Sequence, residues 1–189
     1  MKTIVLNGNQ EIIDAFRGFV PKEYSHYLGD EQALLFGECE AEDDGIAACG
    51  ITILVPAGRE LVIKWMWMDP AYRMKSGGSN MLEAAFETAA ENGFTRVSAH
   101  VPLDEEGDED GSMLGDFFYD AGFTENGTAK QGGIAVKKLT LRTAEYERME
   151  NNRLNAEVAA ERIERAYKKF PKNYKVVDVE YFSGIPVEE

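Results

Sequence analysis

The sequence has only two cysteines, Cys39 and Cys49, in 189 residues. Two cysteines cannot make the disulfide framework of a small secreted protein; the pair could meet across a hairpin, but buried free thiols are the favoured interpretation. No apolar run approaches the roughly 20 residues that a membrane-spanning helix needs. The first residues, MKTIVLNGNQEIIDAF, also lack the apolar block and the cleavage site of a signal peptide. We therefore expect a cytoplasmic protein with no membrane partner.

Basic residues are scarce relative to acidic ones. The chain holds 20 Lys and Arg against 34 Asp and Glu, which gives a formal net charge of −14. Residues 1–141 hold 11 of the basic and 24 of the acidic residues, so the acidity belongs to the first three-quarters of the chain. Such a field repels nucleic acid and attracts cations, and we expect no nucleic-acid partner. A surface that is acidic merely for solubility is the alternative interpretation.

The order of apolar patterns predicts an α/β sandwich around a mixed sheet. The expected helices cover residues 9–21, 22–28, 79–93, 112–123 and 143–170, and the expected strands cover 32–42, 45–55, 60–68, 94–101 and 134–142. The acidic turn 43–45 predicts a hairpin between the first two strands. A crossover helix separates strand 60–68 from strand 94–101, so these two strands should lie parallel.

The stretch DPAYRMKSGGSN (69–80) joins an apolar strand to a helix. It carries two cations, Arg73 and Lys75, and two adjacent glycines, Gly77 and Gly78. A helix N-terminus offers unpaired N–H groups and a positive dipole end, and glycines let another group approach the backbone closely. The pattern predicts an anion site, above all for phosphate.

Residues 142–189 differ in pattern from the rest. They predict a long helix over 143–170, with Thr143 as its N-cap, and an extended tail over 173–189. Apolar and small residues recur at helical spacing along the helix: Met149, Ala156, Ala159, Ala160, Ile163, Ala166, Tyr167 and Phe170. This stripe could pack on the chain's own sheet and helices, or it could join two copies of the chain as a homodimer.

Order and motif together resemble the GNAT superfamily of acyl-CoA-dependent N-acyltransferases. The segment MDPAYRMKSGGSNMLEAAFETAAENGF has the family's frame of strand, Pro, Arg-containing Gly-rich turn and helix, with Pro70, Tyr72 and Arg73 in place. The segment FFYDAGF (117–123) resembles the family's second signature, a short helix that ends in Gly-Phe. The resemblance covers residues 1–141 and implies an α+β fold: a mixed, mostly antiparallel sheet with helices on both faces. Residues 142–189 would be a helical extension.

The resemblance implies that the turn cradles the pyrophosphate of coenzyme A. The co-substrate would be acetyl-CoA or another acyl-CoA, and no metal is implied. The strand before the turn splays from its neighbour in the family, and its backbone at 66–68 would pair with the pantetheine amides. The binding residues would then be Met66, Trp67, Met68, Arg73, Met74, Lys75, Ser76, Gly77, Gly78 and Ser79.

Two positions depart from the family's pattern. Ser76 stands where the family has a glycine, and we expect an ordinary φ there, with Cβ crowding the phosphate. Phe118 stands where the family commonly has a Tyr that protonates the leaving thiolate. Tyr119 is rotated about 100° around a helix from that place. It becomes the expected acid if a local bulge turns it inward, and a packed aromatic if not. These departures leave open a catalytically silent acyl-CoA-binding or protein-interaction module.

A transferase also needs a base to deprotonate the amine. Glu38 and Glu40 alternate on a strand and point to one face, so either could act through a water. His100 ends a strand, and its ordinary pKa near 6.5 suits base work. A polar strand face for the two glutamates, and a structural histidine, are the alternatives.

The acceptor is less well defined by the sequence. Trp65 and Trp67 share one side of their strand while Met66 and Met68 share the other, and one pair could line an acceptor pocket. The acidic loop 102–112 would favour a cationic amine, either a small molecule or a protein. Plain solvated charge is the alternative for this loop.

Overall fold

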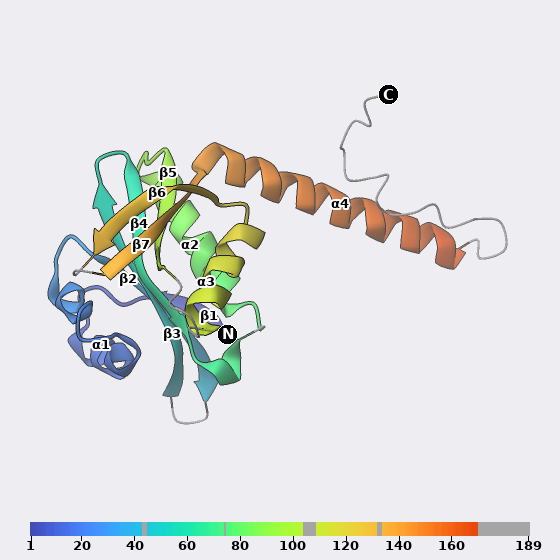
Figure 1. The fold of residues 1–189 in the computed structure, drawn as a ribbon. Coiled ribbons are helices and arrows are strands. Elements are labelled where there is room, and N and C mark those ends of the chain that lie inside the picture. The colour runs from blue at the N-terminus through green and yellow to red at the C-terminus, as the bar shows by residue number, and fades with distance from the viewer. Residues whose placement is uncertain (43–44, 74, 104–108, 132–133, 170–189) are drawn as a thin grey trace. The chain divides into compact units, whose positions relative to one another are not determined.

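A computed structural model of the chain describes residues 1–42, 45–73, 75–103, 109–131 and 134–169 (Figure 1). The chain falls into two compact units, 1–143 and 144–189. The strands are β1 Lys2–Val5, β2 Leu34–Glu42, β3 Gly45–Ala57, β4 Glu60–Met68, β5 Arg96–Pro102, β6 Thr124–Gln131 and β7 Ile134–Arg142. The α-helices are α1 Gln10–Phe16, α2 Gly77–Glu91, α3 Glu109–Asp120 and α4 Thr143–Lys169, and the 3-10 turns are Arg17–Phe19, Ser25–Gly29 and Pro70–Tyr72. The expected tail 173–189 lies outside the described residues.

The first unit is built on one seven-stranded sheet in the order β1-β2-β3-β4-β5-β7-β6. β4 and β5 run parallel, as the crossover through α2 predicted, and each other neighbouring pair is antiparallel. The mixed, mostly antiparallel sheet inferred from the sequence is therefore confirmed.

Helices cover both faces of this sheet (Figure 1). α1 and the two 3-10 turns after it pack on one face over a cluster that includes Phe16, Tyr24, Leu35, Ile51 and Ile53. α2 contacts the strands from β1 to β5, and α3 contacts β5. The buried side chains of α2 recur at helical spacing and include Met81, Leu82, Ala85, Phe86 and Ala89. The end of β4 thus lies in the sheet between the two helical layers, and the start of α2 lies on one face of it.

Two strands that the sequence patterns missed lie at the two edges of the sheet. β1 pairs with β2 alone, and β6 pairs with β7 alone. β6, with the sequence TENGTAKQ, is polar and almost entirely exposed, so it has no apolar alternation to signal a strand. Pairing with β7, rather than burial, places it in the sheet.

α4 has a solvated surface of its own. Arg153 pairs with Glu150 at 2.8 Å and with Glu157 at 2.6 Å, and Arg165 pairs with Glu161 at 3.0 Å. Such exposed pairs at helical spacing each contribute only a few tenths of a kcal/mol. Within the described residues, no helix is both long and apolar enough to cross a membrane.

Candidate functional site

The centre of the sheet opens where β4 and β5 part. Their parallel pairing begins at Glu60 and Arg96 and ends at Ile63 and Ala99, although β4 continues to Met68 and β5 to Pro102. Past that point β4 pairs with β3 alone and β5 with β7 alone. The two backbone edges that face each other there are therefore available to a third, extended group.

A β-bulge in β4 marks the parting. Ile53 of β3 is opposite Trp65, while the next residue, Leu54, is opposite Ile63, so Lys64 is the additional residue. A bulge of this kind increases the local twist and re-aims the side chains that follow it. The strand thus turns away from β5 directly after its last paired residue.

The alternation of β4 past the bulge agrees with the sequence. Trp65 stacks on Tyr24 at 5.1 Å between ring centroids, and Trp67 stacks on Phe19 at 4.7 Å, so both indoles face the α1 side. The indole N–H of Trp65 also donates to the Phe19 carbonyl at 2.9 Å. Ring stacking holds both tryptophan side chains in place, and the hydrogen bond of its N–H group further fixes the orientation of Trp65.

The two methionines of β4 face the opposite side, under the start of α2. A Cβ placed at Gly77 would lie 2.5 Å from the Met68 methyl carbon and 3.1 Å from Glu38 Cγ, so a side chain there would have to displace them. A Cβ at Gly78 would meet Phe117 at 3.4 Å and Met66 at 3.9 Å, which is ordinary contact. The first turn of α2 therefore lies directly on the strand end, as close approach through glycine requires.

The turn itself contains a correction to the sequence interpretation. Ser76 has φ 65 and ψ −7, so it adopts the left-handed conformation of a glycine, not the ordinary φ expected of a serine. It is the N-cap residue of α2; its carbonyl accepts from Asn80 N–H at 2.9 Å, and its hydroxyl donates to the Lys75 carbonyl at 2.6 Å. The loop keeps a glycine-like path because the helix start needs it, and the serine side chain is tolerated on the exposed side.

This geometry makes a prediction for Ser76→Gly. A left-handed conformation costs an L-residue about 1 kcal/mol, whereas glycine adopts it freely but loses more entropy on folding. We expect Ser76→Gly to be neutral or to raise the free energy of unfolding by up to about 1 kcal/mol. Urea unfolding measures it, with Ser76→Ala, which keeps a Cβ, as the matched control. A loss of stability in Ser76→Gly would contradict the strained-loop assignment.

The two cations of the turn, Arg73 and Lys75, make different contacts. Arg73 turns back, so that its Nε donates to the Met68 carbonyl at 3.1 Å and its guanidinium approaches the Met113 sulfur at 3.9 Å. Lys75 is exposed and lies over the Tyr72 ring at 4.9 Å from the centroid. Ser79 is exposed one residue after Gly78. Met74, also expected to contribute, lies outside the described residues.

Glu38, a candidate base, is fully buried beneath the start of α2. Its carboxylate accepts from the Thr3 hydroxyl at 2.6 Å and from the Asn80 side-chain amide at 3.1 Å. The carboxylate therefore ties β1 and β2 to the first turn of α2, at the positive end of the helix dipole. Glu40, two residues later on β2, is exposed. Alternation along β2 places Glu38 and Glu40 on one face of the sheet, as expected. The start of α2 covers Glu38 and leaves Glu40 exposed to solvent.

The two adjacent aromatic residues of α3, Phe118 and Tyr119, differ in their exposure to solvent. Phe118 is 1% exposed and packs on Phe123 at 5.1 Å and on Phe117 at 5.3 Å between centroids. Tyr119 is 41% exposed in a stretch of regular α-helix, with no bulge among the described residues there. The position that resembles the family's general acid is thus a core aromatic, and the hydroxyl next to it faces outward.

A group of charged side chains from three strands lies along the paired part of β4 and β5. Glu60 pairs with Lys138 at 2.8 Å and with Arg96 at 3.4 Å, and it accepts from Ser98 at 2.9 Å. Burial works against ionisation of Glu60, but the bonds from Lys138 and Ser98 outweigh it and hold the pKa of the carboxyl below its usual value. Sequence reasoning missed this group, because its members are far apart along the chain.

Lys64 and His100 extend this group on the side of the parting. Lys64 Nζ lies 3.5 Å from His100 Nδ1, and burial together with the charge of Lys138 lowers the pKa of Lys64. His100 is the first residue of β5 beyond its last pair with β4. We call these six side chains the basic cluster: Glu60, Lys64, Arg96, Ser98, His100 and Lys138.

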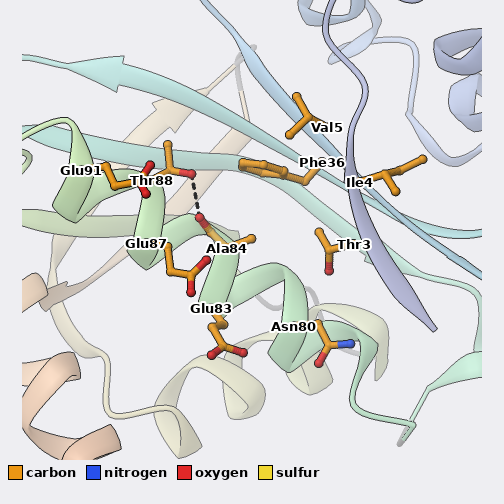
Figure 2. Close-up of a pocket in the computed structure, with 10 residues that line it drawn as sticks. All are labelled: Thr3, Ile4, Val5, Phe36, Asn80, Glu83, Ala84, Glu87, Thr88 and Glu91. Atoms are coloured by element: carbon orange, nitrogen blue, oxygen red, sulfur yellow. Dashed lines mark hydrogen bonds between the residues drawn. The ribbon is translucent and has the colours of Figure 1, made fainter.

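A separate groove of about 470 Å³ lies between β1 and α2 (Figure 2). Glu83, Glu87 and Glu91 line it from α2, opposite Ile4 and Val5 of β1. None of its lining residues belongs to the turn 73–79 or to β5. Among the described residues, no group of three or more His, Cys, Asp or Glu side chains could hold a metal ion.

A family model shows the family to which the chain belongs. The family model described as acetyltransferase (GNAT) family matches residues 9–108, more than half of the chain. No curated protein sequence matches the chain. This protein belongs to the GNAT acetyltransferase family.

Solved structures share the fold at low sequence identity. A GNAT-family acetyltransferase from Desulfovibrio desulfuricans is 15% identical, with a TM-score of 0.58 over 75% of this chain and 98% of that one. An aminoglycoside 6'-N-acetyltransferase in complex with coenzyme A is 7% identical, with a TM-score of 0.55 over 76% and 97%. The PaiA N-acetyltransferase from Thermoplasma acidophilum, also in complex with coenzyme A, is 16% identical, with a TM-score of 0.51 over 75% and 99%. At these identities the likeness is one of fold.

Proposed function

We propose that this protein is an acetyl-CoA-dependent N-acyltransferase that acts on an amine acceptor. The observation that carries the proposal is the opening between β4 and β5, which leads directly to the glycine-lined start of α2. An extended pantetheine would find the edge of β4 at 66–68 that faces away from β3, and a pyrophosphate would find the N–H groups of the turn 73–79. Two solved GNAT relatives of the same fold hold coenzyme A, which supports acyl-CoA as the co-substrate.

The proposed reaction is a direct transfer. The amine nitrogen, freed of one proton, attacks the thioester carbonyl carbon and forms the new C–N bond. The tetrahedral intermediate collapses with cleavage of the C–S bond, and the thiolate takes up a proton as it leaves. Close placement of amine and thioester between the two strands supplies much of the rate, since a held pair avoids the entropy of collision.

We also propose which side chains take the proton from the amine and give one to the thiolate. Glu40 is exposed on β2 and could take the amine proton through a water, whereas the bonds of Glu38 favour a positioning role. Tyr119 would have to reach the thiolate from its exposed place on α3, by a rotamer change or through a water.

The two free, buried cysteines support a cytoplasmic location.

The Tyr119 role has a direct test. If Tyr119 protonates the thiolate, Tyr119→Phe should lower turnover by about 10²-fold with unchanged acetyl-CoA affinity. Steady-state thiol release with a responsive amine measures turnover, and calorimetric titration measures the affinity. Equal turnover of the two proteins would remove Tyr119 from the mechanism.

A second candidate, a silent acyl-CoA-binding module, is favoured by one observation. Phe118 fills the position of the family's general acid with a buried ring that has no proton to give. A thiolate is already a good leaving group, so the loss of an acid slows the transfer rather than forbidding it. Coenzyme A binding without thiol release on any amine would support the silent module.

We further propose that α4 joins two copies of the chain. Met149, Leu154 and Val158 are 41%, 50% and 47% exposed, and Leu154 and Val158, four residues apart, lie on the same face of the helix. Truncation after Arg142 should then lower the particle mass in sedimentation from a dimer to a monomer. The same particle mass and melting temperature before and after truncation would mean that the helix serves another purpose.

A further inference from the structure

The outer edge of β1 is open among the described residues. β1 pairs with β2 on its other side, and their register runs without a break from Lys2 to Val5. The Leu6 N–H donates to the Leu35 carbonyl at 2.9 Å, so alternate residues of β1 turn their backbone groups to β2, and Thr3 and Val5 turn theirs outward. These outward donors and acceptors can pair with a further strand.

The opposite edge of the sheet differs from this one. β6 pairs with β7 through a register shift between Glu125 and Thr128, where Gly127 has φ 90. Such a bulge twists an edge strand and hinders further pairing. β1 has no break of this kind, and the apolar side chain of Val5 is 63% exposed. The sheet thus protects one edge and leaves the other accessible to a strand.

α2 carries a row of carboxylates along the β1 edge, which we call the acidic ridge. The ridge consists of Glu83, Glu87 and Glu91. All three are exposed and line the groove of about 470 Å³ together with Thr3 and Val5 (Figure 2). Among the described residues, none of the three takes part in an ion pair. The ridge therefore offers three carboxylates beside an open strand edge.

The geometry of the ridge matches that of an extended chain. The Thr3 hydroxyl donates to Glu38 beneath α2, so Thr3 and, by alternation, Val5 point to the face of the sheet that α2 covers. A strand added to β1 would point every second side chain to this same face. Four residues of helix rise about 6 Å and two residues of strand span about 6.8 Å, so alternate side chains would meet successive glutamates.

We infer that β1 and the acidic ridge bind an extended basic segment of a partner protein. The segment adds to the sheet beside β1: its main chain pairs with Thr3 and Val5, and lysines or arginines at alternate positions pair with the ridge. The inference goes beyond the proposed transferase and does not rest on it, because no residue that lines the groove belongs to the turn 73–79 or to β5. The groove is also separate from the acidic loop 102–112, of which residues 104–108 lie outside the described residues.

Charge distinguishes this partner from two other strands. A second copy that paired through its own β1 would bring a second acidic ridge beside the first, and like charges repel. Residues 170–189 of this chain hold two lysines against four acidic residues, so they are acidic as well. A basic segment of another protein has the charge that complements the ridge.

A peptide of alternating threonine and lysine, TKTKTKT, is the probe. Amide hydrogen exchange followed by NMR reports on the edge itself, and with peptide at saturation the Thr3 and Val5 N–H groups should exchange at least about tenfold more slowly. The same peptide methylated at every backbone nitrogen keeps its charge but loses its donors. It should give no protection.

Two triple variants of equal net charge test the ridge. Glu83→Gln, Glu87→Gln and Glu91→Gln together should weaken peptide binding about tenfold in calorimetry, as expected for three exposed ion pairs. The control changes three exposed glutamates of the segment that holds α1: Glu11→Gln, Glu23→Gln and Glu31→Gln. It should keep the peptide affinity within about twofold of the parent protein.

The remaining outcomes would each overturn the inference. Binding that survives N-methylation, or that both triple variants weaken equally, would mean that the peptide follows net charge alone. Exchange of Thr3 and Val5 that slows with rising protein concentration would place a second copy at the edge. Slow exchange at every concentration without peptide would place the chain's own residues there. Absence of binding with peptide at about 1 mM would leave the edge without this function.

Discussion

Gly78→Val should bind coenzyme A at least about tenfold more weakly than the parent protein. Valine at this position would extend beyond the Cβ, which already meets Phe117 and Met66 at contact distance. The added methyl groups would fill the space between the first turn of α2 and the strand end, where the proposed pyrophosphate and the adjoining pantetheine would lie. The N–H groups of the turn would remain, but the ligand could no longer approach them.

The control for this variant is Gly29→Val. Gly29 lies in a 3-10 turn on the α1 side, and a Cβ there would meet no atom within 4 Å. Both variants are checked for folding by thermal melting and for coenzyme A affinity by calorimetry. Unchanged affinity in a folded Gly78→Val protein would remove the turn from the binding site.

Glu38→Ala should be the most destabilising of the site variants, by about 3 kcal/mol. It would leave the Thr3 hydroxyl and the Asn80 amide without their carboxylate and open a cavity beneath α2. Glu38→Gln keeps the shape and part of the bonding and should cost about 1 kcal/mol. Urea unfolding measures both, and we expect coenzyme A affinity to fall together with stability, because the same residue holds the start of α2.

Glu40→Gln is the matched control, since Glu40 lies on the same strand face but is exposed. It should leave stability unchanged, and it should lower turnover if Glu40 is the base. A Glu38→Gln protein of parental stability and affinity, with turnover alone reduced, would contradict the positioning role and return Glu38 to catalysis.

The part of the fold that the sequence predicted best is the strand, turn and helix at its centre. β4 has the predicted bounds, and the parallel partner of β4 followed from the crossover helix. A long apolar strand and an amphipathic helix each carry their own periodic signal. β1 and β6 carried none, because edge strands are short or polar and take their place from pairing with a neighbour.

The candidate site was predictable where one segment builds it and not where several segments meet. The turn 69–80 contains its own glycines and cations, but the left-handed φ of Ser76 depends on how α2 begins over β4. Glu38 and Glu40 follow the predicted alternation, yet only the position of α2 decides which of them is buried. The basic cluster draws on β4, β5 and β7, so no local pattern could announce it.

The most direct measurement of the central claim is amine-dependent release of thiol from acetyl-CoA, with the N-acetylated product identified by mass spectrometry. We predict release that requires both protein and amine and that Gly78→Val reduces in proportion to its lost affinity. A folded parent protein that yields neither free thiol nor N-acetylated product with anionic, neutral and cationic amines would contradict it.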